Sequence, residues 1–272
     1  MNVLNKLFII LFLVTIVSIS AQEVIEFKGT IFNRPLLEVT VNSEGSYDFA
    51  LDIGASGIGR INKPLYDEFN FPIIGTEMNS DGINTRAEKT VKVDQLSIGS
   101  LMIKDSELIM RDYGAPISGI LGRDFFAEKT LTIDFPNNRI ILNDKPLDQK
   151  FTKNILTYER PFWIEGKIGD LSTQFNLDTG SSGGFVLPKS LLIKNNINFE
   201  ETGIKKEGKR TYTNVELTEV KLLDNIELGG IIFQNPIVLI NDELNEINVG
   251  SKILKDFIIT IDQKSKLIKF TK

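Results

Sequence analysis

The chain of 272 residues contains no cysteine and no histidine. Without thiols or imidazoles, disulfides, thiolate nucleophiles, Ser-His-Asp or Cys-His catalytic sites and almost every zinc site are excluded. Any catalytic chemistry must therefore use carboxylates, hydroxyls or lysines. We expect neither a cofactor nor a metal ion.

The chain also lacks a basic excess. Its formal net charge is −5 and its pI is about 5.1, with the lysines scattered among acidic residues. Nucleic-acid binding depends on clustered cations, so nucleic acid is not an expected partner. With 42% hydrophobic residues the composition is that of a globular protein that can bury one large or two modest cores.

Long apolar runs are absent beyond the N-terminus. There, Lys6 precedes an apolar run at residues 7–19 that ends among small residues, which is the plan of a cleavable signal peptide over residues 1–21. The run is shorter than the roughly 20 residues of a membrane-spanning helix, although an uncleaved anchor is the alternative. The sequence predicts an exported protein, periplasmic or extracellular, with no membrane contact after cleavage.

A short acidic turn occurs twice, at residues 52–57 (DIGASG) and 178–183 (DTGSSG), each directly after an apolar stretch. An Arg-Pro dipeptide lies 18 residues before each aspartate, and an apolar segment ending in Gly122 or Gly250 follows it. Twelve residues beyond each glycine, a Thr-Ile-Asp run ends in Asp134 or in its counterpart Asp262, which we expect to cap hairpins. This spacing predicts an internal duplication.

Period-two alternation, as at Leu37, Val39 and Val41, indicates a mostly β protein. Short helices are expected at residues 64–69 and 188–195, where proline begins each segment. The polar stretch 143–154 is the expected hinge between the halves. We therefore predict an N-terminal lobe over residues 22–148 and a C-terminal lobe over residues 149–272, meeting at their acidic turns.

Two carboxylates brought together share a proton, so one member acts as a base and the other as an acid. Asp52 and Asp178 are the candidates, and a water between them would attack a peptide carbonyl. The glycines of the turns allow the close approach of two backbones. A hydroxyl is present three residues after Asp178, at Ser181, but Ala55 stands at that position in the first copy. Our hypothesis is that Ser181 donates to Asp178 and makes it the base.

The structural alternative is that both aspartates only hold tight Asx turns.

The two turns, the apolar segments ending in glycine and the Thr-Ile-Asp runs resemble bilobal pepsin-like and retropepsin-like aspartic peptidases of bacterial type. The resemblance spans nearly the whole chain after the signal and implies an all-β fold. It further implies a double-ψ β-barrel-like lobe used twice, with a substrate cleft between the lobes. Its catalytic pair falls on Asp52 and Asp178, and its substrates are peptides or proteins.

The chain departs from the family pattern in three ways. The family usually has threonine after each aspartate, and Thr179 fits this pattern but Ile53 cannot form a side-chain hydrogen bond. Asn248 is polar where Ile120 stands in the first copy. The expected flap, residues 74–86, contains no tyrosine, and its tip is expected at three consecutive residues: Ser80, Asp81 and Gly82.

We expect residues 203–212 to form the counterpart of the flap in the second lobe. The positions expected to support the active-site loops are Ile53, Gly54, Ala55, Ser56, Gly122, Thr179, Gly180, Ser181, Ser182 and Gly250. The resulting prediction is a monomeric aspartic endopeptidase. The alternative is a catalytically weak or inactive peptidase-like fold that acts as an extracytoplasmic peptide-binding or structural module.

Overall fold

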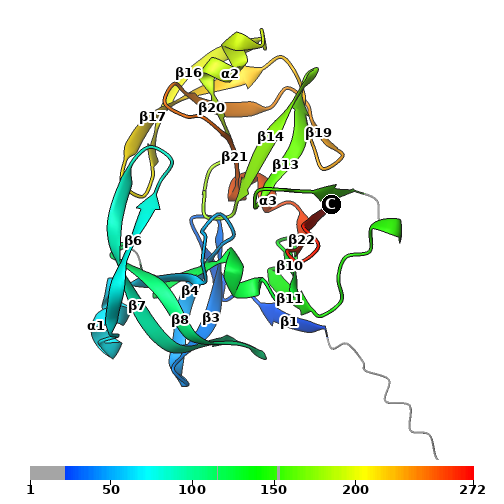
Figure 1. Ribbon diagram of the computed structural model, residues 1–272. Helices are drawn as coiled ribbons and strands as arrows, with labels where there is room; N and C mark the ends of the chain where they lie inside the picture. The colour runs from blue at the N-terminus through cyan, green and yellow to red at the C-terminus, as the bar shows by residue number, and fades with distance from the viewer. Residues whose placement is uncertain (1–21, 115, 152–153) are drawn as a thin grey trace, which may run out of the picture.

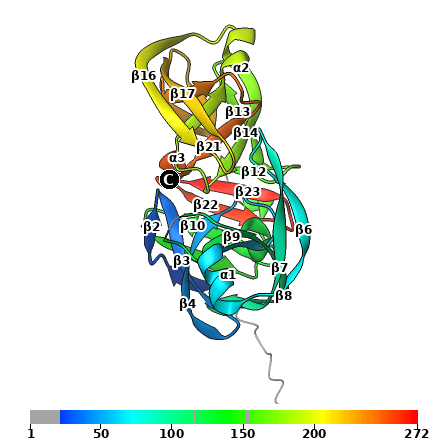
Figure 2. The same cartoon turned by 90° about the vertical axis from the view of Figure 1, so that its left-hand side faces the viewer.

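The computed structural model describes residues 22–114, 116–151 and 154–272. The predicted signal peptide lies outside the described residues. Strands dominate the described chain, so the all-β prediction is confirmed. Three sheets form the molecule, and Figure 2 shows the eight-stranded and nine-stranded sheets at opposite ends with the strands of the six-stranded sheet between them. No helix within the described residues is long and apolar enough to cross a membrane.

The eight-stranded sheet is built from the first half of the chain. In spatial order its strands are β2 (Gly29–Ile31), β3 (Arg34–Val41), β4 (Glu44–Asp52), β9 (Gly119–Gly122), β5 (Gly59–Asn62), β8 (Leu101–Arg111), β7 (Thr85–Ile98) and β6 (Ile73–Ser80). β3 also pairs with β7, which curls the sheet back on itself.

The nine-stranded sheet is built from the second half. In spatial order its strands are β16 (Phe199–Lys209), β17 (Asn214–Leu222), β20 (Ile237–Asn241), β15 (Phe185–Pro188), β21 (Ile247–Gly250), β14 (Leu171–Asp178), β13 (Trp163–Ile168), β18 (Ile226–Leu228) and β19 (Ile231–Phe233).

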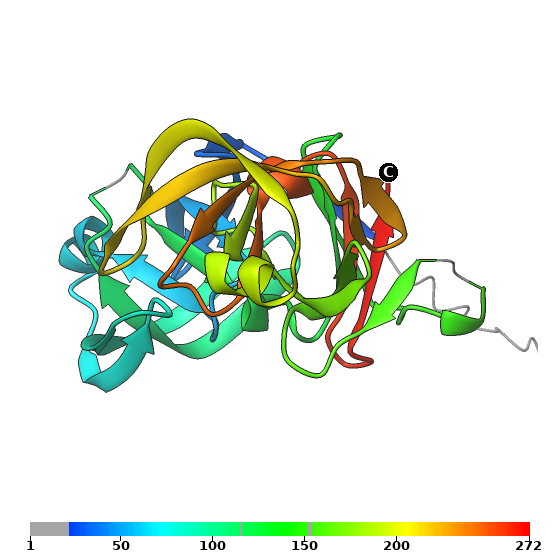
Figure 3. The same cartoon turned by 90° about the horizontal axis from the view of Figure 1, so that it is seen from above.

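The six-stranded sheet joins the two halves. Its order is β1 (Glu23–Glu26), β11 (Arg139–Asn143), β10 (Thr130–Asp134), β22 (Ile258–Asp262), β23 (Leu267–Thr271) and β12 (Ile155–Thr157). At its centre β10 and β22 run antiparallel, with Thr132 opposite Thr260 and their hydroxyls 3.0 Å apart. Figure 1 shows these two strands at the level between the two halves, and Figure 3 shows the C-terminal strand β23 beside β12.

The helices are short. They are α1 (Lys63–Phe69), α2 (Lys189–Lys194) and α3 (Ser251–Leu254), with 3₁₀ turns η1 (Arg123–Phe126) and η2 (Gln149–Phe151). α1 begins where Asn62 accepts a hydrogen bond from the N–H of Lys63 and where proline lies in the first turn; it ends at Asn70, whose φ is +48°. The expected helices are thus present within one or two residues of their predicted bounds.

One apolar cluster runs through both halves and the sheet between them. It includes Leu37 and Phe49 from the first half, Phe175 and Phe185 from the second, and Phe270 near the C-terminus. The composition allows one large or two modest cores, and the structure has one main apolar cluster shared by both halves. The reason is that the sheet of β10 and β22 is apolar and is shared, so neither half buries it alone.

The ends of the hairpins in this shared sheet are closed by buried aspartates. Asp134 is 2% exposed and accepts hydrogen bonds from Asn137 and from Arg139. Asp262 is 3% exposed and accepts from the N–H groups of Ser265 and Leu147. Both aspartates therefore stabilise turns, as predicted.

Candidate active site

Each acidic turn leaves the end of an apolar strand that is paired in parallel with a second strand ending in glycine. Asp52 ends β4 and lies opposite Gly122 of β9. Asp178 ends β14 and lies opposite Gly250 of β21. Parallel pairing brings the carboxyl ends of both strands to one edge, so the chain leaving each glycine passes beside the turn.

The same backbone bonds fasten both turns. The N–H groups of Gly122, Arg123 and Asp124 donate to Ile58, Ala55 and Gly57, and those of Gly250, Ser251 and Lys252 donate to Gly184, Ser181 and Gly183. A side chain at either strand-ending glycine would collide with a carbonyl of the turn. Glycine is therefore required at both positions for the chain to pass this closely.

The two turns face each other with each carboxylate against the other turn's glycine. A Cβ built on Gly54 would meet the Asp178 carboxylate, with Cγ only 2.8 Å away. A Cβ on Gly180 would collide with the Asp52 carboxylate in the same way. The structure thus brings the two predicted aspartates together, with both glycines serving as contact surfaces.

Thr179 ties the two turns together. Its hydroxyl accepts a hydrogen bond from the N–H of Ile53 at 2.9 Å and donates to the carbonyl of Leu51 at 3.1 Å. Thr179 is fully buried, and its own carbonyl accepts a hydrogen bond from the Ser251 hydroxyl. Ile53 is also fully buried but has no polar side-chain atom, so the reciprocal hydrogen bonds are not formed. The link between the turns is one-sided.

Asp52 is partly buried beside apolar neighbours. Ala50 lies on the same face of β4, Ile120 is close by on β9, and both are almost completely buried. Burial, followed by the charge of Asp178, raises the pKa of Asp52 to about 7. The N–H of Ala55, which donates to Oδ1 at 3.0 Å, acts in the opposite direction but does not offset burial.

Cationic groups lie on the Asp52 side of the pair. Arg34 and Arg60 favour the ionised form of Asp52 and so lower its pKa, and Arg123 also interacts electrostatically with Asp52. The guanidinium of Arg123 donates to the carbonyl of Gly54 at 3.0 Å. These arginines counter the effect of burial without reversing it.

Asp178 lies in a different environment. Its Oδ1 accepts a hydrogen bond from the N–H of Gly180 at 2.9 Å, and its Oδ2 accepts one from the side-chain amide of Asn248 at 3.1 Å. Within the described residues Ser181 makes no such contact, and its hydroxyl lies against Gly250 instead. The expected donor Ser181 is therefore wrong, because its side chain packs against the passing strand, and Asn248 takes its place.

The expected flap is a long hairpin formed by β6 and β7. The Asp81 side chain closes the tip by accepting hydrogen bonds from the N–H groups of Ile83 and Asn84. The Ser80 hydroxyl accepts from the N–H of Gly82, whose φ of +88° favours glycine. The three predicted tip residues thus build the turn itself.

The tip of this hairpin contacts the tip of the β16–β17 hairpin of the second half. The N–H of Tyr212 donates to Asp81 at 2.8 Å, the guanidinium of Arg210 donates to the Asp81 carbonyl, and the Asn84 amide donates to Thr213 at 2.7 Å. We call this contact the clasp. The second tip lies at residues 210–213, at the end of the range predicted for a counterpart of the flap.

Ionised Asp81 is central to the clasp. Burial alone would raise the pKa of Asp81, but hydrogen bonds from the N–H groups of Asn84, Tyr212 and Ile83 hold that pKa below its ordinary value. Ile83 adds an apolar contact by packing against a cluster that includes Val215 and Leu217. The clasp therefore combines charge-assisted hydrogen bonds with apolar burial.

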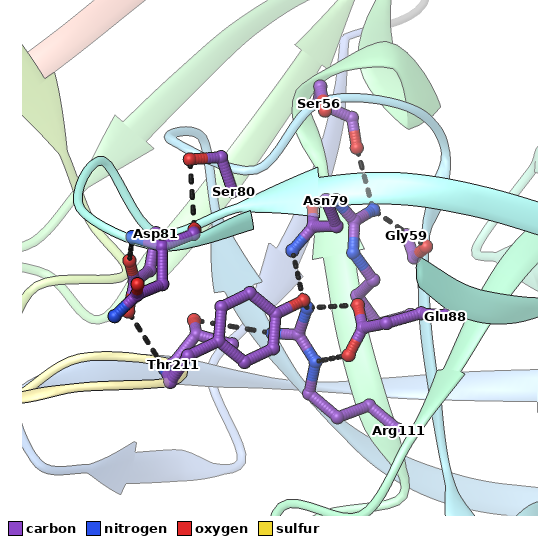
Figure 4. A network of polar contacts seen from close by, with 11 residues as sticks. Ser56, Gly59, Asn79, Ser80, Asp81, Glu88, Arg111 and Thr211 are labelled. Atoms are coloured by element: carbon purple, nitrogen blue, oxygen red, sulfur yellow. Dashed lines mark hydrogen bonds and ion pairs between the residues drawn. The ribbon is translucent and has the colours of Figure 1, made fainter. Parts of the chain in front are cut away.

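A polar network connects the first acidic turn to the clasp (Figure 4). Arg60 is 6% exposed and donates to the carbonyl of Ser56 at 2.7 Å and to Asn79 at 3.4 Å. Asn79 in turn donates to the hydroxyl of Tyr212 at 3.1 Å. Arg111 pairs with Glu88 and lies 5.3 Å from the centre of the Tyr212 ring. The clasp and the Asp52 turn are therefore physically linked.

The sequence pattern does not predict a role for Arg60, includes Tyr212 only as the last residue of the expected flap counterpart, and marks Asn248 only as a departure from the family pattern. The polar residue in an otherwise apolar segment was the available signal for Asn248. Of the predicted loop residues, Ser56 and Ser182 are exposed and contribute carbonyls; that of Ser182 accepts a hydrogen bond from Asn33 of the first half at 3.3 Å.

No cluster of acidic side chains in the described part of the chain could hold a metal ion. A separate surface hollow of about 320 Å³ lies beside Trp163 and Leu191, and neither aspartate lines it. The paired turns are thus the place where titratable groups converge.

Residues 37–125 match an aspartyl protease family. The matched segment contains the first acidic turn and Gly122, and it ends before Asp178. No curated protein matches the sequence. The match supports an aspartyl protease family and, in general, a peptidase function for a chain whose fold is all-β.

Proposed function

We propose that the protein is an exported, bilobal aspartic endopeptidase of the pepsin-like or retropepsin-like form, with Asp52 and Asp178 as its catalytic pair. The observation that carries the proposal is the packing of each carboxylate on the glycine of the opposite turn, because it brings two acids from distant strands together. The family match supports the first turn, and the repeated backbone bonds support the second as its counterpart.

The difference between the two aspartates gives each a role. The pKa of Asp52, raised to about 7, favours its protonated form below neutral pH, so Asp52 is the acid. Asp178 accepts two hydrogen bonds, an arrangement that favours a carboxylate, so Asp178 is the base.

The reaction consumes one water per peptide bond. Asp178 takes a proton from a water molecule as the water oxygen attacks the scissile carbonyl carbon. Asp52 donates its proton to the carbonyl oxygen. The tetrahedral intermediate then collapses. The C–N bond breaks, the leaving nitrogen receives the proton held by Asp178, and Asp52 recovers its proton from the hydroxyl of the intermediate. The pair returns to its starting state without a metal or a cofactor.

The substrates that fit this chemistry are extended segments of peptides or proteins. The reason is that the β6–β7 hairpin reaches the opposite half and contacts it through the clasp. Export is part of the proposal and rests on the N-terminal sequence alone. Cleavage would be endoproteolytic if the substrate runs beneath the hairpin in both directions.

The test is digestion of a mixed peptide library by the mature protein between acidic and neutral pH. We expect Asp52→Asn and Asp178→Asn each to reduce cleavage by about 10²- to 10⁴-fold or more, since each removes one acid-base partner. Asp134→Asn is the control, because Asp134 is a buried carboxylate that holds a turn. Full activity in either active-site variant would refute the catalytic pair.

A second candidate function is a peptidase-like module that binds peptides without cutting them. The observation that favours it is the one-sided link between the turns, in which Ile53 leaves the pair less firmly held. A folded wild-type protein that binds library peptides and cleaves none at any pH would support this reading. Ile53→Thr would then be the first variant to test for gained cleavage.

A further inference from the structure

We infer that Asn248 is a positioning residue that holds Asp178 as the hydrogen-bonded base of the pair. The inference rests on the proposed function, since it assigns a role within the same reaction. No catalytic step passes through Asn248 itself. Its contact is with Asp178.

The strand register brings Asn248 to this position. β14 and β21 run parallel, with Asn176 opposite Asn248 and Asp178 opposite Gly250. Asn248 and Asp178 therefore lie diagonally on one face of the sheet, where side chains can meet. The Asn248 amide reaches Oδ2 of Asp178 at 3.1 Å.

The carboxylate of Asp178 is thereby held at both oxygens. The N–H of Gly180 occupies Oδ1 and the amide of Asn248 occupies Oδ2. Donors directed at a carboxylate favour its ionised form, and two donors in fixed positions also fix the plane of the group. The Oδ1 of Asn248 is buried and has no hydrogen-bond partner in the described structure. The bond to Asp178 is therefore the contact that orients this amide.

The equivalent position in the first half lacks this device. Ile120 occupies the place of Asn248, and Ala50 that of Asn176, so the face beside Asp52 offers no side-chain donor. One backbone N–H, that of Ala55, donates to Asp52. Among the described residues, a side-chain donor therefore hydrogen-bonds to Asp178 but not to Asp52.

Other charged groups do not explain the difference. Arg34, Arg60, Arg123 and Tyr113, which lie on neighbouring elements, interact electrostatically with Asp52. Within the described residues none of the four hydrogen-bonds to Asp178. The arginines favour an ionised Asp52, which is the opposite of the asymmetry proposed. Asn248 is therefore the side chain that favours Asp178 as the ionised member.

The test compares the mature wild-type protein with Asn248→Leu, a variant of similar size without a donor. The pH dependence of kcat/KM for a cleaved peptide is measured, together with the pH titration of the aspartate carboxyls by ¹³C NMR. We expect the acidic limb of the profile to move up by about one pH unit, with roughly a tenfold loss of rate on that limb. KM should change little, because Asn248 contacts an aspartate rather than a substrate.

Asn195→Leu is the matched control. It removes an amide that donates to the carbonyl of Leu191 at 2.8 Å, at the end of α2. The control should leave both the acidic limb and the carboxyl titration unchanged. Asn248→Asp is a second variant of the same shape, useful if the leucine variant does not fold. Because an ionised aspartate cannot donate, it should move the limb in the same direction.

The carboxyl titration separates this inference from the proposed function. If the wild-type protein cleaves no peptide but the titration of the pair moves in the Asn248 variants, the peptidase proposal fails and the role of Asn248 stands. If the folded variants leave both the acidic limb and the titration where they are in the wild type, the role of Asn248 is overturned.

Discussion

Asp52 and Asp178 occupy equivalent places in backbones held by the same hydrogen bonds, yet their surroundings differ. Asp52 lies beside Ala50 and Ile120, and burial raises its pKa to about 7. Asp178 accepts a side-chain hydrogen bond from Asn248. The turn sets where each carboxylate lies, whereas the neighbouring strands set its surroundings, which are apolar beside Asp52 and include an amide donor beside Asp178.

The residues that follow the two aspartates differ as well. Thr179 bonds to two backbone groups of the opposite turn, whereas Ile53 fills an equivalent buried space without a polar atom. Both residues are β-branched, so the shape of the backbone is retained. Thr179 of the second turn therefore hydrogen-bonds to the first half, whereas the Ile53 side chain makes no hydrogen bond in return.

The largest expected effect comes from breaking the existing half of this link. Thr179→Val keeps the shape but removes the hydrogen bonds to Ile53 and Leu51, which should reduce the free energy of unfolding by about 2 to 3 kcal/mol. Ile53→Thr is the mirror variant and should increase that free energy by about 1 kcal/mol. Urea unfolding at one pH measures both. An equal effect of both variants in the same direction would contradict the one-sided link.

An effect of comparable size is expected in the pH dependence of stability. An unfolded aspartate titrates near pH 4, whereas the folded pKa of Asp52 is about 7, so the folded state binds the extra proton between these values. The stabilisation from protonated Asp52 is fully present below about pH 4 and is lost as the pH rises through about 7. Thermal unfolding from pH 4 to 8 should show this decline.

Two variants sharpen the interpretation of that decline. Asp52→Asn should remove it, because the group no longer titrates. Asp178→Asn should shift it to lower pH, since the charge of Asp178 is the second largest cause of the raised pKa. A decline that is unchanged in Asp52→Asn would assign it to another group.

The smallest effect is expected at the clasp, where the two halves meet through exposed hairpin tips. Tyr212→Ala removes the side-chain contacts with Asn79 and Arg111 but keeps the backbone bond to Asp81. It should change global stability by less than about 1 kcal/mol but increase amide hydrogen exchange at residues 81–84. Asn214→Ala, which loses only a contact with Glu207 on its own hairpin, is the control. Because ionised Asp81 forms the clasp, protection should also fall as the pH falls through the lowered pKa of Asp81.

The parts of the fold that sequence predicts are those set by local chemistry. The turns with glycine, the proline-started helices and the alternating strands depend on neighbours in sequence, and the repeat then relates Asp52 to Asp178. The shared sheet, the Asn248 contact 70 residues from its partner and the clasp across about 130 residues depend on register between distant strands. A hydroxyl at Ser181 indicated a donor, but only the packing against Gly250 shows that it points elsewhere.

Arg60 gives the clasp a significance beyond holding two hairpins. Arg60 donates to the carbonyl of Ser56, in the turn of Asp52, and to Asn79, which in turn donates to Tyr212. Thr179 of the second half donates to the carbonyl of Leu51, next to Asp52. The contacts form a circuit that passes once through each half of the molecule. Opening the clasp breaks one side of that circuit and leaves the hydrogen bonds of Thr179 as its other side. A ligand that binds the Asp52 turn more tightly when the clasp is closed would, by reciprocity, make the clasp harder to open.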